Sequence, residues 1–331
     1  LFSATAGQLA DKLEKSAMIR WIKFAEVVVM GLGAFSFWLS DVYLMIFVLF
    51  LMGVQSTFFG PAKYSILPDH LSENELIGGN ALIEAGTFLA ILVGTIVGGL
   101  FILGGHGTEI ISSLVVGLAA LGLAASFGIP KAAPPEPGLK LNPNFLGETW
   151  DIIRHAGERR DIFLSILGIS WFWLLGATFL AQFPAFAKDV VGADQTVVTL
   201  FLTLFSVGIA LGSLLCNKIL KGEVSAKYVP FGAVGMTVFI TDLYFASTGR
   251  ELASQSLIGV GAFLEAAGNW RIAFDLTATS ICGGLFIVPL YVILQTRSEE
   301  SHRSRVMAAN NIMNALFMVG GALAATAALA M

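Results

Sequence analysis

Charged residues are scarce in this 331-residue sequence, in which Asp, Glu, Lys and Arg together make up 13%. Soluble domains carry about 25% charged residues, so a chain this poor in charge cannot cover a water-facing surface. Cysteine and histidine are also rare, with two and four copies, and neither a Cys-x-x-Cys pair nor a His-Glu-x-x-His motif occurs. We therefore expect no metal site, and we interpret Cys216 and Cys282 as small apolar side chains.

Long hydrophobic runs take the place of the missing charge. Hydrophobic residues make up 56% of the sequence, and its mean hydropathy is +0.80. A helix needs about 20 apolar residues to cross the hydrocarbon core of a bilayer. The sequence thus predicts an all-α polytopic membrane protein with nine complete spans, at 20–39, 42–66, 77–104, 109–129, 161–187, 196–220, 227–247, 270–294 and 306–331.

Both ends of the sequence are apolar. It opens on Leu1-Phe2-Ser3, which resembles the end of an earlier span, and it stops at Met331 within a hydrophobic run. We therefore expect the fold to be truncated at both ends, with at least one further helix before Leu1 and one after Met331.

The basic residues predict the orientation of the spans. If successive loops alternate sides, three of the 19 Lys and Arg residues lie on one side, namely Lys188, Arg250 and Arg271. The other 16 gather on the opposite side, which the positive-inside rule makes cytoplasmic. Residues 7–15, 130–160 and 296–305 are all predicted to lie on this basic side.

A proline-rich segment divides the chain. Residues 130–161 hold five of the ten prolines, which favours an extended linker. Its second part places Phe145, Leu146, Trp150 and Ile153 near helical spacing, so we expect a short amphipathic helix, either on the inner membrane face or in solution. The predicted domains are an N-terminal bundle at 1–129, a cytoplasmic linker at 130–160 and a C-terminal bundle at 161–331.

The two halves contain matching segments. GPAKYSIL at Gly60–Leu67 resembles VPLYVIL at Val288–Leu294, and GQLADK at Gly7 resembles GSLLCNK at Gly212. Parallel repeats of this kind are typical of transporters built from two helical bundles.

One charge lies deep inside a span. Glu84 belongs to NALIEAGTFLAIL, residues 80–92, and follows a predicted capping box at Ser72–Glu75. A charge at mid-membrane costs about 2.5–3.5 kcal/mol on insertion scales. Asn80, Glu84 and Thr87 share one helix face, which we expect to line a cavity or, alternatively, to form a structural bridge to another helix.

Paired glycines predict packing rather than chemistry. Gly94 with Gly98, and Gly208 with Gly212, have the spacing that lets membrane helices approach closely. Gly31 and Gly33 do not form a nucleotide-binding loop, because no strand precedes them. We expect no cofactor and no nucleic-acid partner.

The segment GQLADKLEK, Gly7–Lys15, resembles the loop motif between helices 2 and 3 of the major facilitator superfamily. Gly7, Leu9, Ala10, Asp11, Lys12 and Lys15 fit the motif, whereas Glu14 replaces its second glycine and Ser16 its final basic residue. The resemblance implies the fold of that superfamily, with two pseudo-symmetric bundles. It also implies that Gly7, Asp11 and Lys12 act in gating.

FFGPAKYSILPDHL, residues 58–71, together with the segment around Glu84, is similar to the bacterial lysophospholipid transporter family. This similarity implies transport of lysophospholipids, such as lysophosphatidylethanolamine, from the outer to the inner leaflet of the cytoplasmic membrane for reacylation. The implied partners are membrane lipids and an acyltransferase or acyl-carrier-protein synthetase, either separate or fused.

A set of polar residues is predicted to hold the substrate. Glu84 suits an ethanolamine ammonium, and Asn80 and Thr87 share its face. Asn310 and Asn314 are expected to present a matching amide face from the opposite bundle. These amides, with Lys63 and Tyr64 nearer the inner surface, are predicted to meet the phosphate.

Two other functions compete with lipid transport. The first is a cation-coupled antiporter of drugs or small metabolites in the same superfamily, with Glu84 as its proton-coupling carboxylate. The second is a membrane anchor for an enzyme whose catalytic domain lies elsewhere. The sequence itself shows no nucleophile–base pair and no His-x-x-x-x-Asp acyltransferase motif, so we expect a transporter rather than an enzyme.

Overall fold

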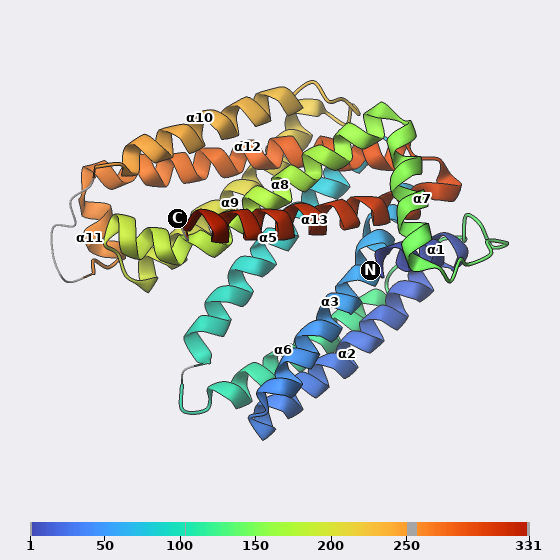
Figure 1. The fold of residues 1–331 in the computed structure, drawn as a ribbon, viewed down its shortest axis with the longest axis horizontal. Coiled ribbons are helices and arrows are strands. Elements are labelled where there is room, and N and C mark those ends of the chain that lie inside the picture. The colour runs from blue at the N-terminus through green and yellow to red at the C-terminus, as the bar shows by residue number, and fades with distance from the viewer. Residues whose placement is uncertain (1, 103, 250–256, 330–331) are drawn as a thin grey trace. The chain divides into compact units, whose positions relative to one another are not determined.

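The computed structural model describes residues 2–102, 104–249 and 257–329, and these residues are almost entirely helical (Figure 1). Arg250, one of the three basic residues predicted on the outer side, lies outside the described residues. The elements, in chain order, are α1 (Ser3–Lys12), α2 (Lys15–Leu39), α3 (Val42–Ser65), α4 (Leu67–His70), α5 (Leu76–Phe101), α6 (Gly107–Ser126), α7 (Phe145–Glu158), α8 (Arg160–Ala185), the π-helical η1 (Phe186–Val191), α9 (Gln195–Leu220), α10 (Val229–Ser247), α11 (Val260–Glu265), α12 (Ala267–Arg297), the 3₁₀ turn η2 (Glu300–His302) and α13 (Arg303–Leu329).

The predicted number of spans is confirmed for the part of the chain that the structure describes. Nine helical segments there are long and apolar enough to cross a membrane. Side-chain caps explain where several of them begin. Asp41 accepts hydrogen bonds from the Tyr43 and Leu44 amides at the start of α3, and Asp194 accepts one from the Thr196 amide at the start of α9. Polar residues between the apolar runs therefore position the helix starts.

The chain separates into two compact units, each built from several segments. The first unit comprises residues 1–72, 95–166 and 294–313, and the second comprises residues 73–94, 167–293 and 314–331. The predicted division into an N-terminal bundle at 1–129 and a C-terminal bundle at 161–331 stays a prediction.

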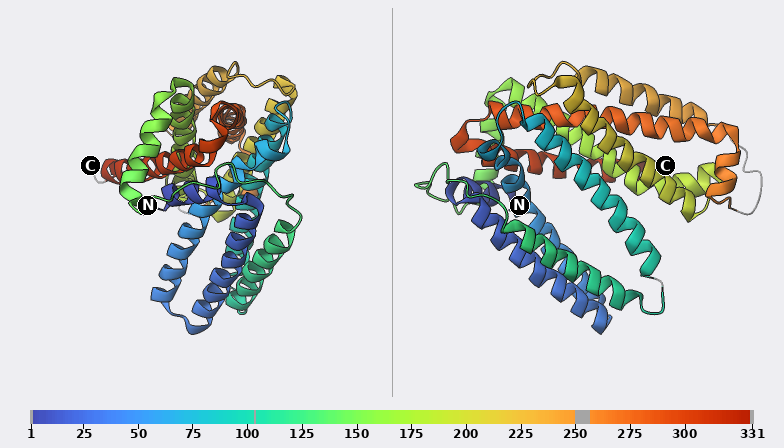
Figure 2. Two further views of the ribbon diagram at one scale, coloured as in Figure 1. Left: turned by 90° about the vertical axis from the view of Figure 1, so that its right-hand side faces the viewer. Right: turned by 180° about the vertical axis from the view of Figure 1, so that it is seen from behind.

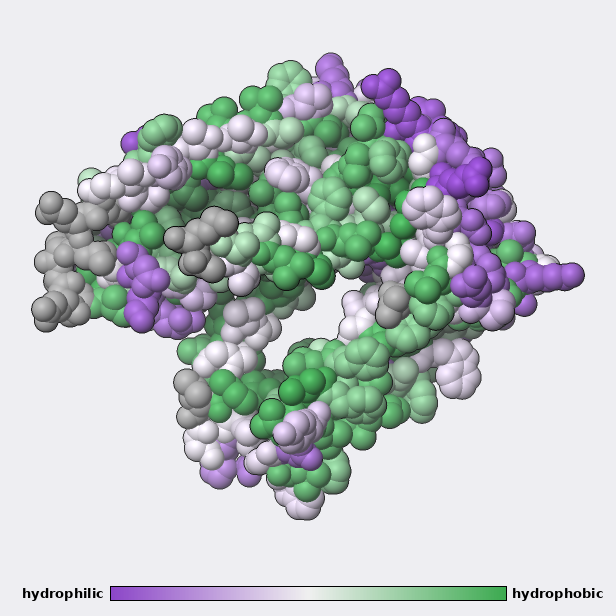
Figure 3. Space-filling model, viewed as in Figure 1, coloured by the Kyte–Doolittle hydropathy of each residue, from purple (hydrophilic) through white to green (hydrophobic). Residues whose placement is uncertain are grey.

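In the first unit, α2 packs between α3 and α6, and the three helices run side by side in all three views (Figures 1 and 2). Large apolar side chains point outward along α2 and α3, including Trp21, Trp38 and Tyr43. Figure 3 shows this hydrophobic covering and, around α7 and the linker, a gathering of hydrophilic residues. An apolar outer surface on long helices is what a lipid environment requires.

In the second unit, glycines bring helices into close contact. A methyl group at Gly208 would overlap the Ser280 side chain, and one at Gly212 would overlap the Ile281 carbonyl. The prediction of a packing face on α9 is therefore confirmed, and α12 is its partner. A methyl group at Gly94 or Gly98 would meet no described atom within 4 Å, so the packing face predicted for that pair stays a prediction.

The linker has the two parts that the sequence predicts. Residues 130–144 contain no helix, and α7 begins at Phe145 with Asn144 as its cap, accepting a hydrogen bond from the Gly147 amide at 3.1 Å. The extended part is held in place by its backbone, since the Ala132 amide donates to Glu14 Oε1 and the Glu136 amide to the Asp11 carbonyl, both at 2.9 Å. The linker is thus an ordered part of the first unit.

Candidate functional site

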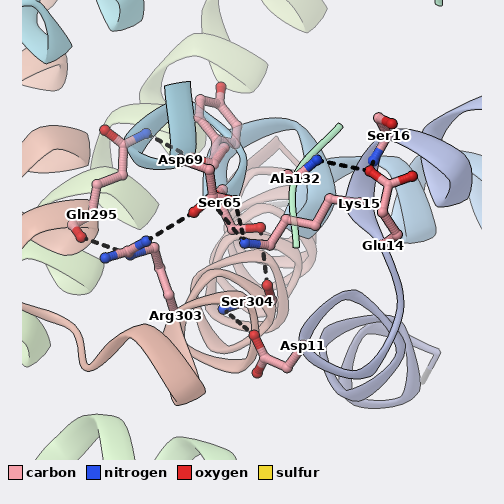
Figure 4. A network of polar contacts seen from close by, with 11 residues as sticks. Asp11, Glu14, Lys15, Ser16, Ser65, Asp69, Ala132, Gln295, Arg303 and Ser304 are labelled. Atoms are coloured by element: carbon pink, nitrogen blue, oxygen red, sulfur yellow. Dashed lines mark hydrogen bonds and ion pairs between the residues drawn. The ribbon is translucent and has the colours of Figure 1, made fainter. Parts of the chain in front are cut away.

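A polar network in the first unit is centred on Asp11 of α1 (Figure 4). Asp11 is fully buried and accepts hydrogen bonds from the Ser304 amide at 3.0 Å, the Arg305 amide at 3.3 Å and Arg305 Nε at 3.0 Å. The carboxylate therefore caps the start of α13, where a negative charge is favoured by the exposed amides and the helix dipole. Arg305 also donates to Glu136 Oε2 at 2.6 Å.

Gly7 makes this contact possible. A methyl group at Gly7 would lie 2.8 Å from Ala308 Cβ and 3.0 Å from Arg305 Cα. Only a glycine lets α1 and α13 approach this closely, and Asp11 lies one turn further along α1. The motif glycine and the motif aspartate thus serve one contact.

A second chain of ion pairs lies beside the first. Lys15 Nζ is 2.6 Å from Asp69 Oδ2, and Arg303 Nη1 is 3.4 Å from Asp69 Oδ1. The Lys15 side chain is only 1% exposed. Asp69 therefore forms ion pairs with two basic side chains, one at the start of α2 and one at the start of α13.

Hydroxyl and amide groups join the two chains of ion pairs. The Ser304 hydroxyl donates to the Ser65 hydroxyl at 2.9 Å, and Gln295 Nε2 donates to the Tyr64 carbonyl at 2.9 Å. Tyr64 belongs to the GPAKYSIL segment, and Gln295 directly follows its sequence echo, VPLYVIL. The residue after one segment therefore contacts the backbone of the other segment within the first unit.

Two carboxylates of the first unit, Asp11 and Glu14, have shifted pKa values. Burial raises the pKa of Asp11 above its ordinary value, and the hydrogen bonds from Ser304 and Arg305 oppose that rise. Burial also acts to raise the pKa of Glu14, but the hydrogen bonds from Ser16, Ala132 and Ala17 outweigh it and lower the pKa to about 2. Glu14 is the N-cap of α2, so the residue that departs from the superfamily motif has a structural role of its own.

The predicted gating residues were Gly7, Asp11 and Lys12. The structure brings Gly7 and Asp11 to the same contact, whereas Lys12 lies partly exposed at the end of α1. Sequence reasoning missed the partners that complete the network, which are Asp69, Gln295, Arg303, Ser304 and Arg305. A signal for two of them was available, since Arg303 and Arg305 are basic residues at the predicted cytoplasmic start of the last span.

In the second unit, α5 carries the predicted substrate-binding face. Asn80 and Glu84 are fully buried, and one hydrogen bond runs from Asn80 Nδ2 to the Leu76 carbonyl at 2.9 Å. Thr87 is partly buried, and its hydroxyl donates to the Ile83 carbonyl at 2.7 Å. Protein rather than lipid therefore surrounds Glu84, as the cost of a lipid-exposed charge requires.

Aromatic rings lie one turn beyond Glu84. The Phe88 ring, on the same face of α5, lies 5.9 Å from Trp173, 6.0 Å from Phe172 and 6.2 Å from Phe205, measured between ring centroids. Trp173 donates from Nε1 to the Tyr291 hydroxyl at 3.1 Å. One helix face thus passes from amide and carboxylate to an aromatic cluster.

The other predicted binding residues are distributed over both units. In the first unit, the Lys63 ammonium lies 4.4 Å from the centre of the Tyr64 ring. Asn310 is buried there, and neither end of its amide has a hydrogen-bond partner among the described residues. In the second unit, Asn314 accepts a hydrogen bond from the Ser170 hydroxyl at 2.9 Å.

The structure also shows a charge cluster inside a predicted span that sequence reasoning missed. Glu26 of α2 lies 2.8 Å from Lys23 Nζ and accepts a hydrogen bond from Gln55 of α3 at 2.6 Å. Ionisable residues are rare within membrane spans, so the presence of Lys23 and Glu26 in the predicted span 20–39 was the sequence signal for this cluster.

The comparisons with known proteins agree with this architecture. The family model described as Major Facilitator Superfamily matches residues 1–322. The chain is 28% identical over 311 residues to the lysophospholipid transporter LplT of Escherichia coli O1:K1, an alignment that covers 91% of this chain and 69% of that protein. The LplT protein of E. coli O157:H7 is 27% identical over 314 residues, with the same coverage.

Solved structures show the same fold. The fucose:proton symporter of E. coli has a TM-score of 0.67 with this chain at 13% identity, covering 99% of this chain and 81% of the symporter. A bacterial homologue of the iron transporter ferroportin, in its outward-facing state, has a TM-score of 0.64 at 14% identity, covering 98% of this chain and 78% of that protein. The chain is therefore a multi-pass membrane transporter rather than an enzyme, and it belongs to the major facilitator superfamily.

Proposed function

We propose that this transporter moves lysophospholipids from the outer to the inner leaflet of a bacterial cytoplasmic membrane by alternating access. The observation that carries the proposal is the similarity to proteins named lysophospholipid transporters, which extends over 91% of the chain. The products would serve reacylation by an acyltransferase or acyl-carrier-protein synthetase, either separate or fused.

The chemistry of α5 supports this substrate class. A lysophospholipid has a charged head group and a single acyl chain, so its carrier needs a few polar groups beside a largely apolar surface. Asn80, Glu84 and Phe88 lie on one face of α5 at intervals of one turn, with both polar residues buried and Phe88 packed against other rings. Glu84 is our candidate for the ethanolamine ammonium, and the aromatic cluster is our candidate for the first part of the acyl chain.

The phosphate requires different groups. The positively charged Lys63 is of the chemical type that binds a phosphate. Asn310 has an amide without a protein partner in the described part of the chain. Together with Tyr64 and Asn314, these residues stay the candidates that the sequence predicts. The proposal for Glu84 does not depend on them.

Alternating access requires contacts that can separate and form again. The network around Asp11 suits this role, because it joins α1, the linker and the start of α13 through ion pairs and hydrogen bonds rather than through apolar packing alone. Water can replace such partners when the segments separate. We assign Gly7 and Asp11 to the gate that closes one side of the transporter.

The decisive experiment is uptake of radiolabelled lysophosphatidylethanolamine by spheroplasts that carry Glu84→Gln. This substitution keeps the size and much of the hydrogen bonding of the side chain but removes its charge, so we expect uptake to fall by about tenfold or more, the loss of one charge-assisted contact. Glu109→Gln is the matched control, because the Glu109 side chain is 76% exposed and its loss should leave uptake unchanged.

Two outcomes would contradict the proposal in different ways. Uptake at the wild-type rate in Glu84→Gln would make Glu84 a structural bridge rather than a substrate contact. Absence of lysolipid uptake in the wild-type protein, combined with efflux of cationic dyes, would favour the antiporter function instead.

A further inference from the structure

Three charged residues form a cluster in the second unit that the proposed function does not use. Arg271 and Asp275 lie one turn apart on α12, and Asp242 lies on α10. Arg271 donates from Nε to Asp242 Oδ2 at 2.9 Å and from Nη2 to Asp242 Oδ1. The cluster lies near the beginning of α12, away from the end that carries Arg297.

Asp275 differs from the ion pair beside it in burial. The Arg271 and Asp242 side chains are 52% and 38% exposed, whereas Asp275 is fully buried. Neither carboxyl oxygen of Asp275 has a hydrogen-bond donor among the described residues. A buried carboxylate without donors is strongly disfavoured in an apolar surrounding.

A proton removes this cost. The like charge of Asp242 nearby disfavours ionisation of Asp275 as well. Arg271 already neutralises Asp242. A proton on Asp275 would therefore leave the whole cluster electrically neutral.

Among the described residues, the elements around Asp275 bring few titratable groups to it. The charged groups that act on Asp275 are Asp242 and Arg271. Residues 162–185 of α8 and residues 195–215 of α9, the helices packed along α12, contain no titratable side chain. Glu265 of α11 is exposed.

The cluster is connected to the candidate substrate face. One turn beyond Asp275, Thr279 lines a cavity of about 10 Å³ together with Phe172 and Phe205, a volume that suffices for one water molecule. These two rings are the ones that pack against Phe88 of α5. One turn of α12 and this cavity therefore separate Asp275 from the aromatic cluster next to Glu84.

We propose that Asp275 is a proton-binding site of this transporter. On deprotonation its O–H bond breaks, the proton leaves to water through the half-exposed Arg271–Asp242 end, and Arg271 is then shared between two carboxylates. This shift in Arg271 is the structural consequence of proton release. The proposal needs a membrane transporter but does not depend on the identity of the substrate.

The test is infrared spectroscopy of the full-length protein in lipid nanodiscs, without substrate. In mildly acidic buffer we expect the carbonyl stretch of a protonated carboxyl group, and we expect it to disappear as the pH is raised. Asp275→Asn should remove one such group per molecule, while Glu109→Gln should leave the band intact. A band of wild-type amplitude in Asp275→Asn would overturn the proposal.

Two further variants keep the test decisive if Asp275→Asn does not fold. Asp242→Asn frees Arg271 to pair with Asp275, so the band should be lost at the same pH. Arg271→Gln leaves the charge of Asp242 without its cation, so a second negative charge on Asp275 becomes less favourable and the band should persist to higher pH than in the wild type. Equal bands in these two variants would also overturn the proposal. Because no substrate is present, a failed lysolipid assay would not affect either result.

Discussion

The two units treat buried charge in opposite ways. In the first, Asp11 accepts three hydrogen bonds and faces Arg305, and the buried Lys15 pairs with Asp69. In the second, Asp275 is equally buried, yet neither of its carboxyl oxygens has a hydrogen-bond donor in the part of the chain that the structure describes. Both arrangements satisfy the same physical requirement, which is that no uncompensated charge stays in an apolar interior.

The difference determines how each region can change state. A paired network changes by separation, because water can take over both partners once the segments part. A carboxyl group without a cation of its own changes by gaining or losing a proton. We infer that the first arrangement suits a gate and the second suits a coupling site.

The largest expected effect comes from removing one partner of a buried ion pair in the first unit, so that the charge left behind is less well compensated. Asp11→Asn keeps an acceptor for the Ser304 amide but leaves Arg305, among the described carboxylates, with Glu136 as its remaining partner. Removing one partner of a buried ion pair costs about 3–5 kcal/mol, and the remaining Glu136 should keep the loss near the lower limit. We expect a lower melting temperature in detergent and uptake reduced by about tenfold or more, since each tenfold corresponds to about 1.4 kcal/mol.

Asp161→Asn is the matched control for that variant. It also removes a carboxylate paired with an arginine in the first unit, but the Asp161 side chain is 42% exposed, and surface pairs contribute little. If Asp11→Asn transported and melted as this control does, Asp11 would have no part in the gate.

The helices, and the buried polar residues within them, could be predicted from the sequence because both depend on local properties of the chain. Hydropathy and helix length depend on neighbouring residues only, so the nine spans and α7 are encoded locally. The burial of Glu84 followed from cost alone, since a carboxylate inside a span must avoid lipid. The close approach at Gly7 could likewise be anticipated, because a glycine in a motif before a helix end permits such a contact.

The partners of these residues could not be predicted in the same way. Asp11 meets Ser304 and Arg305, which lie more than 290 positions away, and no spacing rule connects them. Glu14 was interpreted as a departure from a motif, although its carboxylate caps α2 and holds Ala132 of the linker. Asp275 was overlooked because its significance lies in burial without donors, which only the packing of α10 and α12 reveals.

The next effect concerns a carboxylate held by neutral donors rather than by a cation. The pKa of Glu14 falls from its ordinary 4.5 to about 2, so Glu14 stabilises the folded protein above pH 4.5 and loses that contribution as the pH falls toward 2. Glu14→Gln should melt below the wild type at neutral pH, because the amide is a weaker acceptor than the carboxylate. The gap between the two melting temperatures should narrow as the pH is lowered.

Thermal melts in detergent over a pH series test this expectation. Glu158→Gln, at a side chain that is 62% exposed, should show almost no gap at any pH. A gap for Glu14→Gln that stayed constant down to acid pH would mean that the cap contributes through its shape and not through its charge.

The smallest effect concerns the outer surface of the first unit, where α7 is an apolar exception among hydrophilic residues. Leu146 and Trp150 are 62% and 68% exposed, whereas Ile152 and Ala156 are buried against the protein. An exposed apolar stripe of this kind is stable at a membrane interface, which is also a favourable environment for the indole ring of tryptophan. The alternative is a helix surrounded by water. We expect brominated lipids in nanodiscs to quench Trp150 fluorescence, measured as the difference between the wild type and Trp150→Phe. Trp150→Phe should change melting and uptake very little, because it keeps most of the apolar surface. If brominated lipid left this difference spectrum unchanged, the outer face of α7 would lie in solution rather than at the membrane interface.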